Sequence, residues 1–222
     1  MSKICVVASH PDDETLGCGG TLLRHKDNRD ELFWIIVTSM DVKNGWKKEQ
    51  VEKRRKEIDC VNREYGFKKT FNLNLPTTRL DVIPMTDIIK LMGRIMQDVG
   101  PHTVYLPNFS DIHTDHKITF QAGYSCCKSF RYPTVSRVLM YETLSETEFA
   151  LPIEGQVFAP NTFVDITKYF QKKTEIMKIY KSEVMESPYP RSIDTIKALA
   201  ALRGSRIGKK YAEAFNLIYE QR

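Results

Sequence analysis

Hydrophobic residues in this chain occur either in short continuous runs or at every third or fourth position of longer stretches. Residues 3–9 and 32–38 are continuous runs rich in Val and Ile. Such runs are typical of strands covered on both faces of a parallel sheet. Between them, a Gly-rich turn leads into a helical stretch that Thr15 could cap and that ends at Asp27. This order predicts a βαβ unit with a right-handed crossover.

Strand-like and helix-like stretches continue to alternate along the rest of the chain. The last periodic stretch, 193–218, keeps its apolar residues near one helical stripe that is interrupted at Gly204. No internal repeat or low-complexity linker is present, so residues 1–222 are expected to form a single domain. We expect further strands at residues 70–75, 103–106 and 135–141, and helices at 47–65, 85–99, 119–130 and 166–180.

The order of these stretches predicts the class of fold. Strands rich in Val and Ile that alternate with helices indicate an α/β protein with three layers, α/β/α, and a mainly parallel sheet. In such open sheets, ligands bind beyond the carboxyl ends of the strands. A functional site is therefore expected directly after the strands at 3–9 and 103–106.

Two clusters of polar side chains follow these two strands. The first is Ser9-His-Pro-Asp-Asp-Glu14, in which one imidazole and three carboxylates lie within five residues. The second is Asp111-Ile-His-Thr-Asp-His116, with two histidines and two carboxylates. One such cluster alone would be typical of a solvated turn. Two clusters at strand ends instead indicate a metal site built from two distant parts of the chain.

A catalytic zinc site uses about three protein ligands from His, Asp, Glu or Cys and leaves a fourth position open. His10 and Asp13 are three residues apart, so a tight turn can aim both at one ion, and His116 would complete the set. His113 lies about one helical turn from His116, and spacing alone does not decide which of the two binds the metal. The other histidine would stay near the substrate in its protonated form.

The remaining carboxylates are expected to support this site. Asp12 is the candidate general base, because the ligand set leaves it unused beside the metal. Asp111 and Asp115 are candidates for the hydrogen bonds that fix the histidine tautomers. The same donors suit iron(II), so an iron(II) oxygenase is an alternative. A non-catalytic protein that binds a sugar or nucleotide, with a structural ion or none, is another.

The composition and net charge argue against two classes of partner, nucleic acids and membranes. The chain has 33 basic and 28 acidic residues, and the net charge of +5 is too small to indicate nucleic acid binding. The basic stretch at 47–57 lacks interleaved aromatic residues and is expected to be a solvated helix face. No apolar run approaches the roughly 20 residues that span a bilayer. We therefore expect a cytoplasmic protein with no membrane or nucleic acid partner.

The cysteines and glycines do not indicate a different site. The five cysteines show no CxxC spacing and are expected to be reduced and mostly buried, with Cys18 close enough to the polar loop to be an additional ligand. The segment Gly17-Cys-Gly-Gly-Thr-Leu22 matches a dinucleotide-binding loop only in part, because Leu22 occupies the position of its third glycine. A dinucleotide site is therefore not expected.

Taken together, the two clusters resemble the active-site motifs of the LmbE/PIG-L family of metal-dependent de-N-acetylases. The resemblance implies a Rossmann-like α/β fold, one Zn2+ ion with Fe2+ also accepted, and removal of an N-acetyl group from an N-acetylglucosamine-type sugar. It rests on His10-Pro-Asp-Asp-Glu14 with Gly17-Cys-Gly-Gly20, on Asp111-x-His-x-Asp-His116, on Leu75-Pro-Thr-Thr-Arg-Leu80, and on Arg203-Gly204, Gly208 and Tyr211-Ala-Glu-Ala-Phe215.

Carried to this chain, the resemblance assigns a role to individual residues. It implies that the metal ligands are His10, Asp13 and His116. Asp12 would be the general base, and His113 and Asp115 would be the other catalytic residues. Thr114 stands where a proline is usual in the family. The expected substrate-binding residues are Arg55, on the helix at 47–65, together with Arg79, Asn108 and Asp111.

The function expected from the resemblance is a deacetylase acting on a small N-acetylated amino sugar, either a glycoside or a sugar nucleotide. Its products would be acetate and a free amine. An amidase that cleaves a larger amide of a sugar-thiol conjugate is the alternative within the family. The resemblance also favours a homo-oligomer.

Overall fold

In this computed structural model, which describes residues 1–153 and 155–221, the described residues form one sheet of seven strands. In order across the sheet they are β3 (Lys69–Pro76), β2 (Glu31–Ser39), β1 (Lys3–Ala8), β4 (Thr103–Pro107), β5 (Arg137–Tyr141), β7 (Ala212–Glu220) and β6 (Thr162–Asp165). The first five run parallel, and β7 pairs antiparallel with both of its neighbours. The expected mainly parallel sheet is confirmed.

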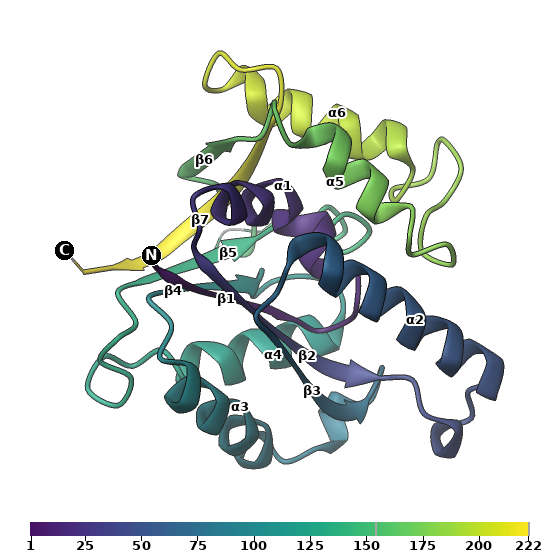
Figure 1. The fold of residues 1–222 in the computed structure, drawn as a ribbon, viewed down its shortest axis with the longest axis vertical. Helices are drawn as coiled ribbons and strands as arrows, with labels where there is room; N and C mark the ends of the chain where they lie inside the picture. Colours follow the sequence, from purple (N-terminus) through teal and green to yellow (C-terminus); the bar gives the residue numbers. More distant parts are fainter. Residues whose placement is uncertain (154, 222) are drawn as a thin grey trace.

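Helices cover both faces of the sheet and complete the three layers (Figure 1). Each of the two helix layers packs its apolar side chains against one face of the sheet, so the hydrophobic core has two parts. Two short 3-10 helices, η1 (Val42–Asn44) and η2 (Leu80–Val82), follow β2 and β3. One face carries α1 (Asp13–Asp27), α2 (Lys48–Tyr65), α5 (Phe170–Met177) and α6 (Ile193–Ser205), and the other carries α3 (Met85–Val99) and α4 (Thr114–Ser125).

Strand β1 is buried on both faces, as its continuous apolar run predicts. Ile4 and Val6 pack in the core under α1 and α2, whereas Cys5 and Val7 pack in the core under α3 and α4. All four side chains are at most 1% exposed. Because both faces need apolar residues, the first polar cluster can begin only where the strand ends.

Helix α1 begins at Asp13, within the first polar cluster and earlier than expected. It is kinked at Cys18, whose φ of −141° is not helical. The expected cap at Thr15 is wrong, because its hydroxyl donates to Glu14 Oε1 (2.6 Å) inside the helix. The N-cap residue is Asp12. Two other helices also differ from expectation: α4 begins at residue 114 instead of 119, and α5 covers only 170–177 of the range 166–180.

The stretch 193–218 is not one interrupted helix. Helix α6 ends at Ser205, and the chain turns back as the antiparallel strand β7. Gly204 allows this turn, because a Cβ there would lie 2.5 Å from the Lys209 carbonyl oxygen. Short apolar runs can suit either a helix or a strand, which explains the wrong prediction.

No helix in the described part of the chain combines the length and apolar character needed to cross a membrane.

Candidate active site

A cavity of about 890 Å3 opens beyond the carboxyl ends of β1 and β2. Its walls include both polar clusters, the exposed end of α2 and residues of the segment between α5 and α6. Strands β1 and β4 are neighbours in the sheet, so the loops that follow them meet at this edge. Among the residues that line the cavity are His10, Asp12, Asp13, His113 and His116.

His10, Asp13 and His116 form a group of metal-ligand type at the centre of the cavity. The Asp13 Oδ1 atom lies 3.3 Å from His116 Nε2, and Asp13 Oδ2 lies 3.9 Å from His10 Nδ1. All three ligand atoms are within 4.8 Å of one another. Two nitrogens and one carboxylate oxygen at these separations fit a zinc ion with an open position. The geometry thus favours His116 over His113 as the second histidine ligand.

Two buried carboxylates orient these histidines. The Asp111 Oδ2 atom is 2.8 Å from His116 Nδ1, and Asp115 Oδ2 is 3.1 Å from His10 Nε2. Each bond fixes one ring nitrogen and turns the other toward Asp13. These contacts are the ones that the expected role of Asp111 and Asp115 in fixing the tautomers requires.

The electrostatics of this group favour an ion pair between the Asp13 carboxylate and a charged His116 imidazole. Burial opposes ionisation of Asp13, but the neighbouring His116 and His10 lower the pKa of this carboxyl below its usual range. Burial also disfavours a charged imidazole, but Asp13 and Asp111 raise the pKa of His116 well above its usual value. A cation entering the site therefore has to displace a proton from His116.

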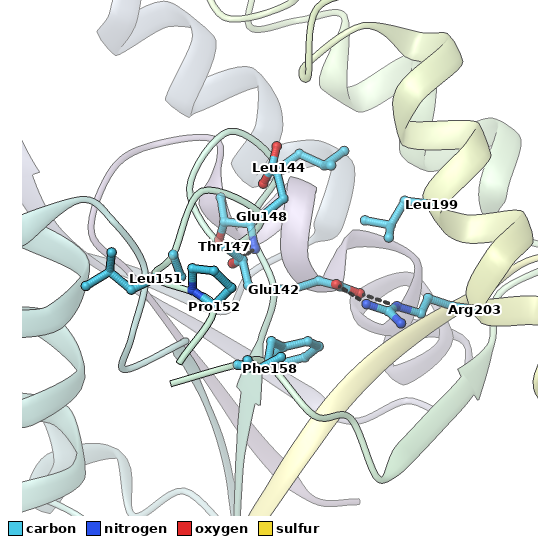
Figure 2. A pocket seen from close by; sticks show the side chains of 12 residues that line it. Glu142, Leu144, Thr147, Glu148, Leu151, Pro152, Phe158, Leu199 and Arg203 are labelled. Carbon is cyan, nitrogen blue, oxygen red and sulfur yellow. Dashed lines mark hydrogen bonds and ion pairs between the residues drawn. The ribbon is translucent and has the colours of Figure 1, made fainter. Parts of the chain in front are cut away.

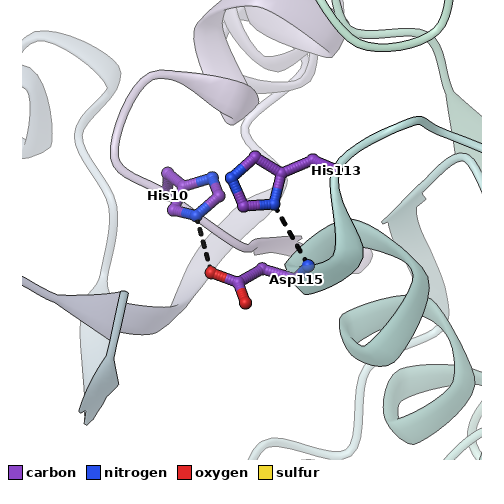
Figure 3. A group of neighbouring side chains, drawn as sticks. All are labelled: His10, His113 and Asp115. Atoms are coloured by element: carbon purple, nitrogen blue, oxygen red, sulfur yellow. Dashed lines mark hydrogen bonds and ion pairs between the residues drawn. The ribbon is translucent and has the colours of Figure 1, made fainter. Parts of the chain in front are cut away.

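His113 lies beside this group and caps α4. Its Nδ1 accepts a hydrogen bond from the backbone N–H of Asp115 (3.1 Å), and Figure 3 shows its ring next to that of His10. Burial and the nearby His10 and His116 lower the pKa of His113 to about 4. This lowered pKa favours a neutral His113 at neutral pH, in contrast to the expected protonated form. Because Nδ1 is an acceptor, the neutral ring carries its proton on Nε2.

His10, His113 and Asp115 form a second group whose ligand atoms also lie within 4.8 Å of one another (Figure 3). Here the carboxylate is already used, because Asp115 Oδ2 accepts the Thr78 N–H (2.7 Å) and Oδ1 accepts the Leu80 N–H (3.1 Å). The first group therefore fits a metal better.

Asp12 lies next to the ligand Asp13 in an unusual backbone conformation. Its φ of 134° and ψ of −27° fall in a region that residues other than Gly rarely adopt. Holding a residue in such a conformation costs about 1–3 kcal/mol of stability. Burial and the charges of Asp13 and Glu183 raise the pKa of Asp12 well above its usual value. The guanidinium groups of Arg191 and Arg54 oppose this rise in pKa.

The expected substrate-binding residues fall into three groups. Asp111 and Asn108 are 0% and 1% exposed and lie outside the cavity lining, so the structure shows no surface through which either could contact a substrate. Asn108 Nδ2 donates to Asp111 Oδ1 (3.0 Å), which supports His116 instead. Arg79 is exposed and also lies outside the lining. Arg55 is exposed at the rim of the cavity and lines it.

Other residues of the site were missed or misplaced. Arg54, not Arg55, is the buried arginine of α2, and Glu183 and Arg191 reach the cavity from the segment after α5. Nothing in the local sequence marks the last two, whereas the buried phase of α2 would have distinguished the arginines. Cys18 is not among the possible ligands; its Sγ bonds the Glu14 carbonyl oxygen (3.3 Å) and burial raises its pKa.

A second cavity, of about 280 Å3, shares Thr143 with the first (Figure 2). One wall is the ion pair in which Arg203 Nε and Nη2 donate to the two Glu142 carboxylate oxygens (2.8 and 2.6 Å). No imidazole is present among the described residues that line this cavity. The candidate metal-binding groups therefore belong to the first cavity.

Comparison with known proteins is consistent with this assignment. A sequence profile of the GlcNAc-PI de-N-acetylase family (PIG-L) matches residues 5–127, more than half of the chain. The uncharacterized deacetylase YaiS of Escherichia coli K12 is 28% identical over 186 residues, which cover 81% of this chain and 90% of that protein. The diacetylchitobiose deacetylase of Thermococcus kodakarensis is 23% identical over 232 residues, covering 98% and 84%.

A solved structure shares the fold. The N,N'-diacetylchitobiose deacetylase from Pyrococcus horikoshii, in complex with an inhibitor, superposes with a TM-score of 0.79 at 22% sequence identity. The superposition covers 98% of this chain and 84% of that chain. At this level of identity the likeness establishes a common architecture.

Proposed function

Because this chain belongs to the GlcNAc-PI de-N-acetylase (PIG-L) family, we propose that it is a metal-dependent deacetylase of N-acetylated amino sugars. It would hydrolyse the N-acetyl group to acetate and leave a free amine. The observation that carries the proposal is the grouping of His10, Asp13 and His116, with the Asp12 carboxylate beside them but outside the ligand set. Hydrolysis of an amide needs such a base in addition to the ligands.

The proposed metal site consists of His10, Asp13 and His116, and its donor set suits Zn2+, with Fe2+ also possible. Bound there, the cation would supply a Lewis acid that polarises an amide carbonyl and makes a neighbouring water more acidic. Asp111 and Asp115 would keep the two imidazoles aimed at it.

The remaining steps belong to side chains of the cavity. The Asp12 carboxylate would take a proton from the attacking water and later return it to the nitrogen of the leaving amine. His113 would donate its Nε2–H to the oxygen that becomes negatively charged when water adds to the amide carbonyl. A neutral imidazole suits this role, because a hydrogen-bond donor is needed there but a net charge is not.

The cavity and the relatives support a small saccharide as substrate. A volume of about 890 Å3 is far larger than an acetyl group and leaves space for at least one sugar ring. Two of the similar proteins are named as diacetylchitobiose deacetylases. We therefore propose an N-acetylglucosamine-type glycoside or sugar nucleotide, with a larger amide of a sugar-thiol conjugate as the alternative.

Acetate release from a panel of substrates tests the proposal. The panel contains N-acetylglucosamine, diacetylchitobiose, UDP-N-acetylglucosamine and sugars with a longer N-acyl chain, each with and without added Zn2+. We expect metal-dependent acetate release from at least one N-acetyl sugar and little cleavage of longer acyl groups. Cleavage of the longer groups alone would favour the amidase, and a requirement for dioxygen would exclude a hydrolase.

Asp12→Asn provides the matched control for this assay. The substitution should lower kcat by at least about 10²-fold, because general base catalysis is lost. It should leave metal content unchanged, because Asp12 lies outside the ligand set. Full activity of the variant would remove Asp12 from its proposed role.

Two further parts of the proposal concern the oligomeric state and the cellular location of the protein. A homo-oligomer is supported by family resemblance, and sedimentation velocity would test it. A cytoplasmic location is supported by the cysteines, all of which are free in the structure, as is usual in a reducing compartment. Fractionation of cells that produce the protein would test the location.

A further inference from the structure

Asp12, the proposed general base, is held in position by residues that are distant from it in the sequence. Arg191 lies near its carboxylate, whereas Tyr180 and Glu183 act on it through Glu14 and Arg54; all three belong to the segment 180–191 between α5 and α6. This segment lies outside the residues 5–127 matched by the family profile. Three sets of contacts connect this segment to Asp12.

The first contact holds the backbone in front of Asp12. Arg54 is only 6% exposed, and its Nη1 donates to the carbonyl oxygen of Pro11 (2.9 Å). Its Nη2 donates to Glu183 Oε1 and to Ser182 Oγ (3.1 Å). Its guanidinium also lies over the ring of Tyr180, with Cζ 5.5 Å from the ring centroid. Arg54 therefore connects the loop between β1 and α1 to the segment 180–191.

The second contact reaches the Asp12 carboxylate itself. Arg191 Nη1 donates to Glu183 Oε2 (3.0 Å) and lies 3.6 Å from Asp12 Oδ2. The two oxygens of Glu183 thus join two guanidinium groups. One guanidinium grips the carbonyl before Asp12, and the other faces its side chain.

A third contact holds the backbone N–H of Asp12, which donates to Glu14 Oε2 (3.1 Å). The other oxygen of Glu14 accepts a hydrogen bond from the Tyr180 hydroxyl (2.9 Å). Asp12 is therefore fixed at its N–H, at the preceding carbonyl and at its carboxylate. A strained backbone such as that of Asp12 persists only where its surroundings impose it in this way.

We propose that residues 180–191 form a clamp that positions Asp12 for proton transfer, with Glu183 as its central residue and Arg191 as the group that orients the Asp12 carboxylate. The inference deepens the proposed function and depends on it for the role of Asp12. Glu183 and Arg191 also line the cavity, so the competing explanation is direct contact with substrate. The two explanations predict different kinetic and structural results.

Hydrogen exchange measures the clamp without any need for activity. The variants are Glu183→Gln, Glu183→Ala and Arg191→Ala, with Glu186→Gln as the matched control, because Glu186 is exposed on the same segment. We expect faster amide exchange in residues 10–16 of the three clamp variants and wild-type exchange in the control. Unchanged exchange in the clamp variants would overturn the proposal.

Kinetics separate positioning from substrate contact. We expect Arg191→Ala to lower kcat by about 10–100-fold, as for a base displaced by about 1 Å, with KM changed less than about 3-fold. Guanidinium ions added to this variant should restore part of the activity, and metal content should match wild type. In an Asp12→Asn background, the same substitution should have no further effect on kcat.

Several results would overturn the clamp. These are a change in KM alone, loss of bound metal, or an equal effect of Arg191→Ala with and without Asp12. If wild type releases no acetate from any substrate, the proposed function fails, while the exchange experiment still decides whether the clamp exists. The two failures are therefore distinguishable.

Discussion

The two ring nitrogens of His113 have different tasks. Nδ1 accepts the Asp115 backbone N–H and caps α4, which leaves Nε2 as the nitrogen that can donate to a group in the cavity that His113 lines. Asn can keep the cap but lacks a donor in the same place, and Ala lacks both. We predict that His113→Asn lowers kcat by about 10²–10³-fold, as removal of an oxyanion donor does. It should leave the free energy of unfolding close to wild type.

His113→Ala is the informative companion. It should lose the same activity and, in addition, about 1 kcal/mol of stability through the missing cap. Urea denaturation and initial-rate kinetics on the two variants measure these effects. Equal stability of the two variants would show that the cap contributes nothing.

The lowered pKa of His113 predicts a pH dependence of stability. In the unfolded chain the imidazole titrates near about 6.5, whereas in the folded protein burial and two neighbouring histidines lower its pKa to about 4. Between these values the unfolded state binds more protons. Wild type without metal should therefore lose stability relative to His113→Asn as pH falls from about 6.5 to 4. Above pH 7 the difference should be flat; a slope there would contradict the assignment.

At the scale of elements, helix α1 is held at its kink by a buried ion pair. Glu213 of β7 accepts the N–H groups of Gly20 and Thr21 (2.8 and 2.7 Å), and Lys173 of α5 donates to Glu213 (2.7 Å) and to the Leu16 carbonyl (2.8 Å). Both charged residues are at most 5% exposed. The kink that directs the first turn of α1 toward the cavity thus depends on two later elements.

Glu213 should contribute more than Lys173 to the free energy of unfolding. Glu213→Ala leaves a buried ammonium with only one carbonyl partner and two uncapped N–H groups, which should cost about 3–5 kcal/mol. Lys173→Met leaves a carboxylate that still has two N–H donors, so its cost should be clearly smaller. Chemical denaturation of both variants tests this order, and the reverse order would contradict it.

Some elements could be predicted from the sequence and others could not. The clusters at residues 9–14 and 111–116 were predictable as neighbours, because both follow Val- and Ile-rich strands of a parallel sheet, whose carboxyl ends share one edge. Strand β7 was not predictable, because a short apolar run fits either a helix or a strand until its partner is known.

Side-chain roles were harder to predict where packing decides them. Arg54 and Arg55 are adjacent, and only the phase of α2 against the segment 180–191 places one inside and the other at the rim. Glu183 and Arg191 lie in irregular structure, where no periodicity reports burial. Asp111 was expected both to orient a histidine and to bind substrate, and its complete burial beside His116 favours the first role.

At the scale of the whole molecule, metal binding should join two distant parts of the chain and release a proton. Because Asp13 and Asp111 keep His116 protonated in the free site, about one proton should leave when a cation binds at pH 7. Apparent affinity should rise with pH until His116 is deprotonated. Calorimetry in two buffers with different ionisation enthalpies measures the proton count, and zero release would contradict the assigned ligand.

The same binding should stabilise the fold. At a free Zn2+ concentration about 100-fold above its dissociation constant, the free energy of unfolding should increase by about 2.7 kcal/mol. His116→Ala should remove most of this increase, which differential scanning calorimetry with and without a chelator would detect. A wild-type transition that does not respond to the cation would argue against the site.

Strand β7 lies inside the sheet, between β5 and β6, although it follows both of them in the chain. During translation, both polar clusters leave the ribosome well before this strand does. Until β7 arrives, β6 has no neighbour in the sheet and α1 lacks the carboxylate that fixes its kink. A nascent chain would therefore hold both polar clusters before its sheet is complete, and the edge of β5 would stay unpaired until β7 is made.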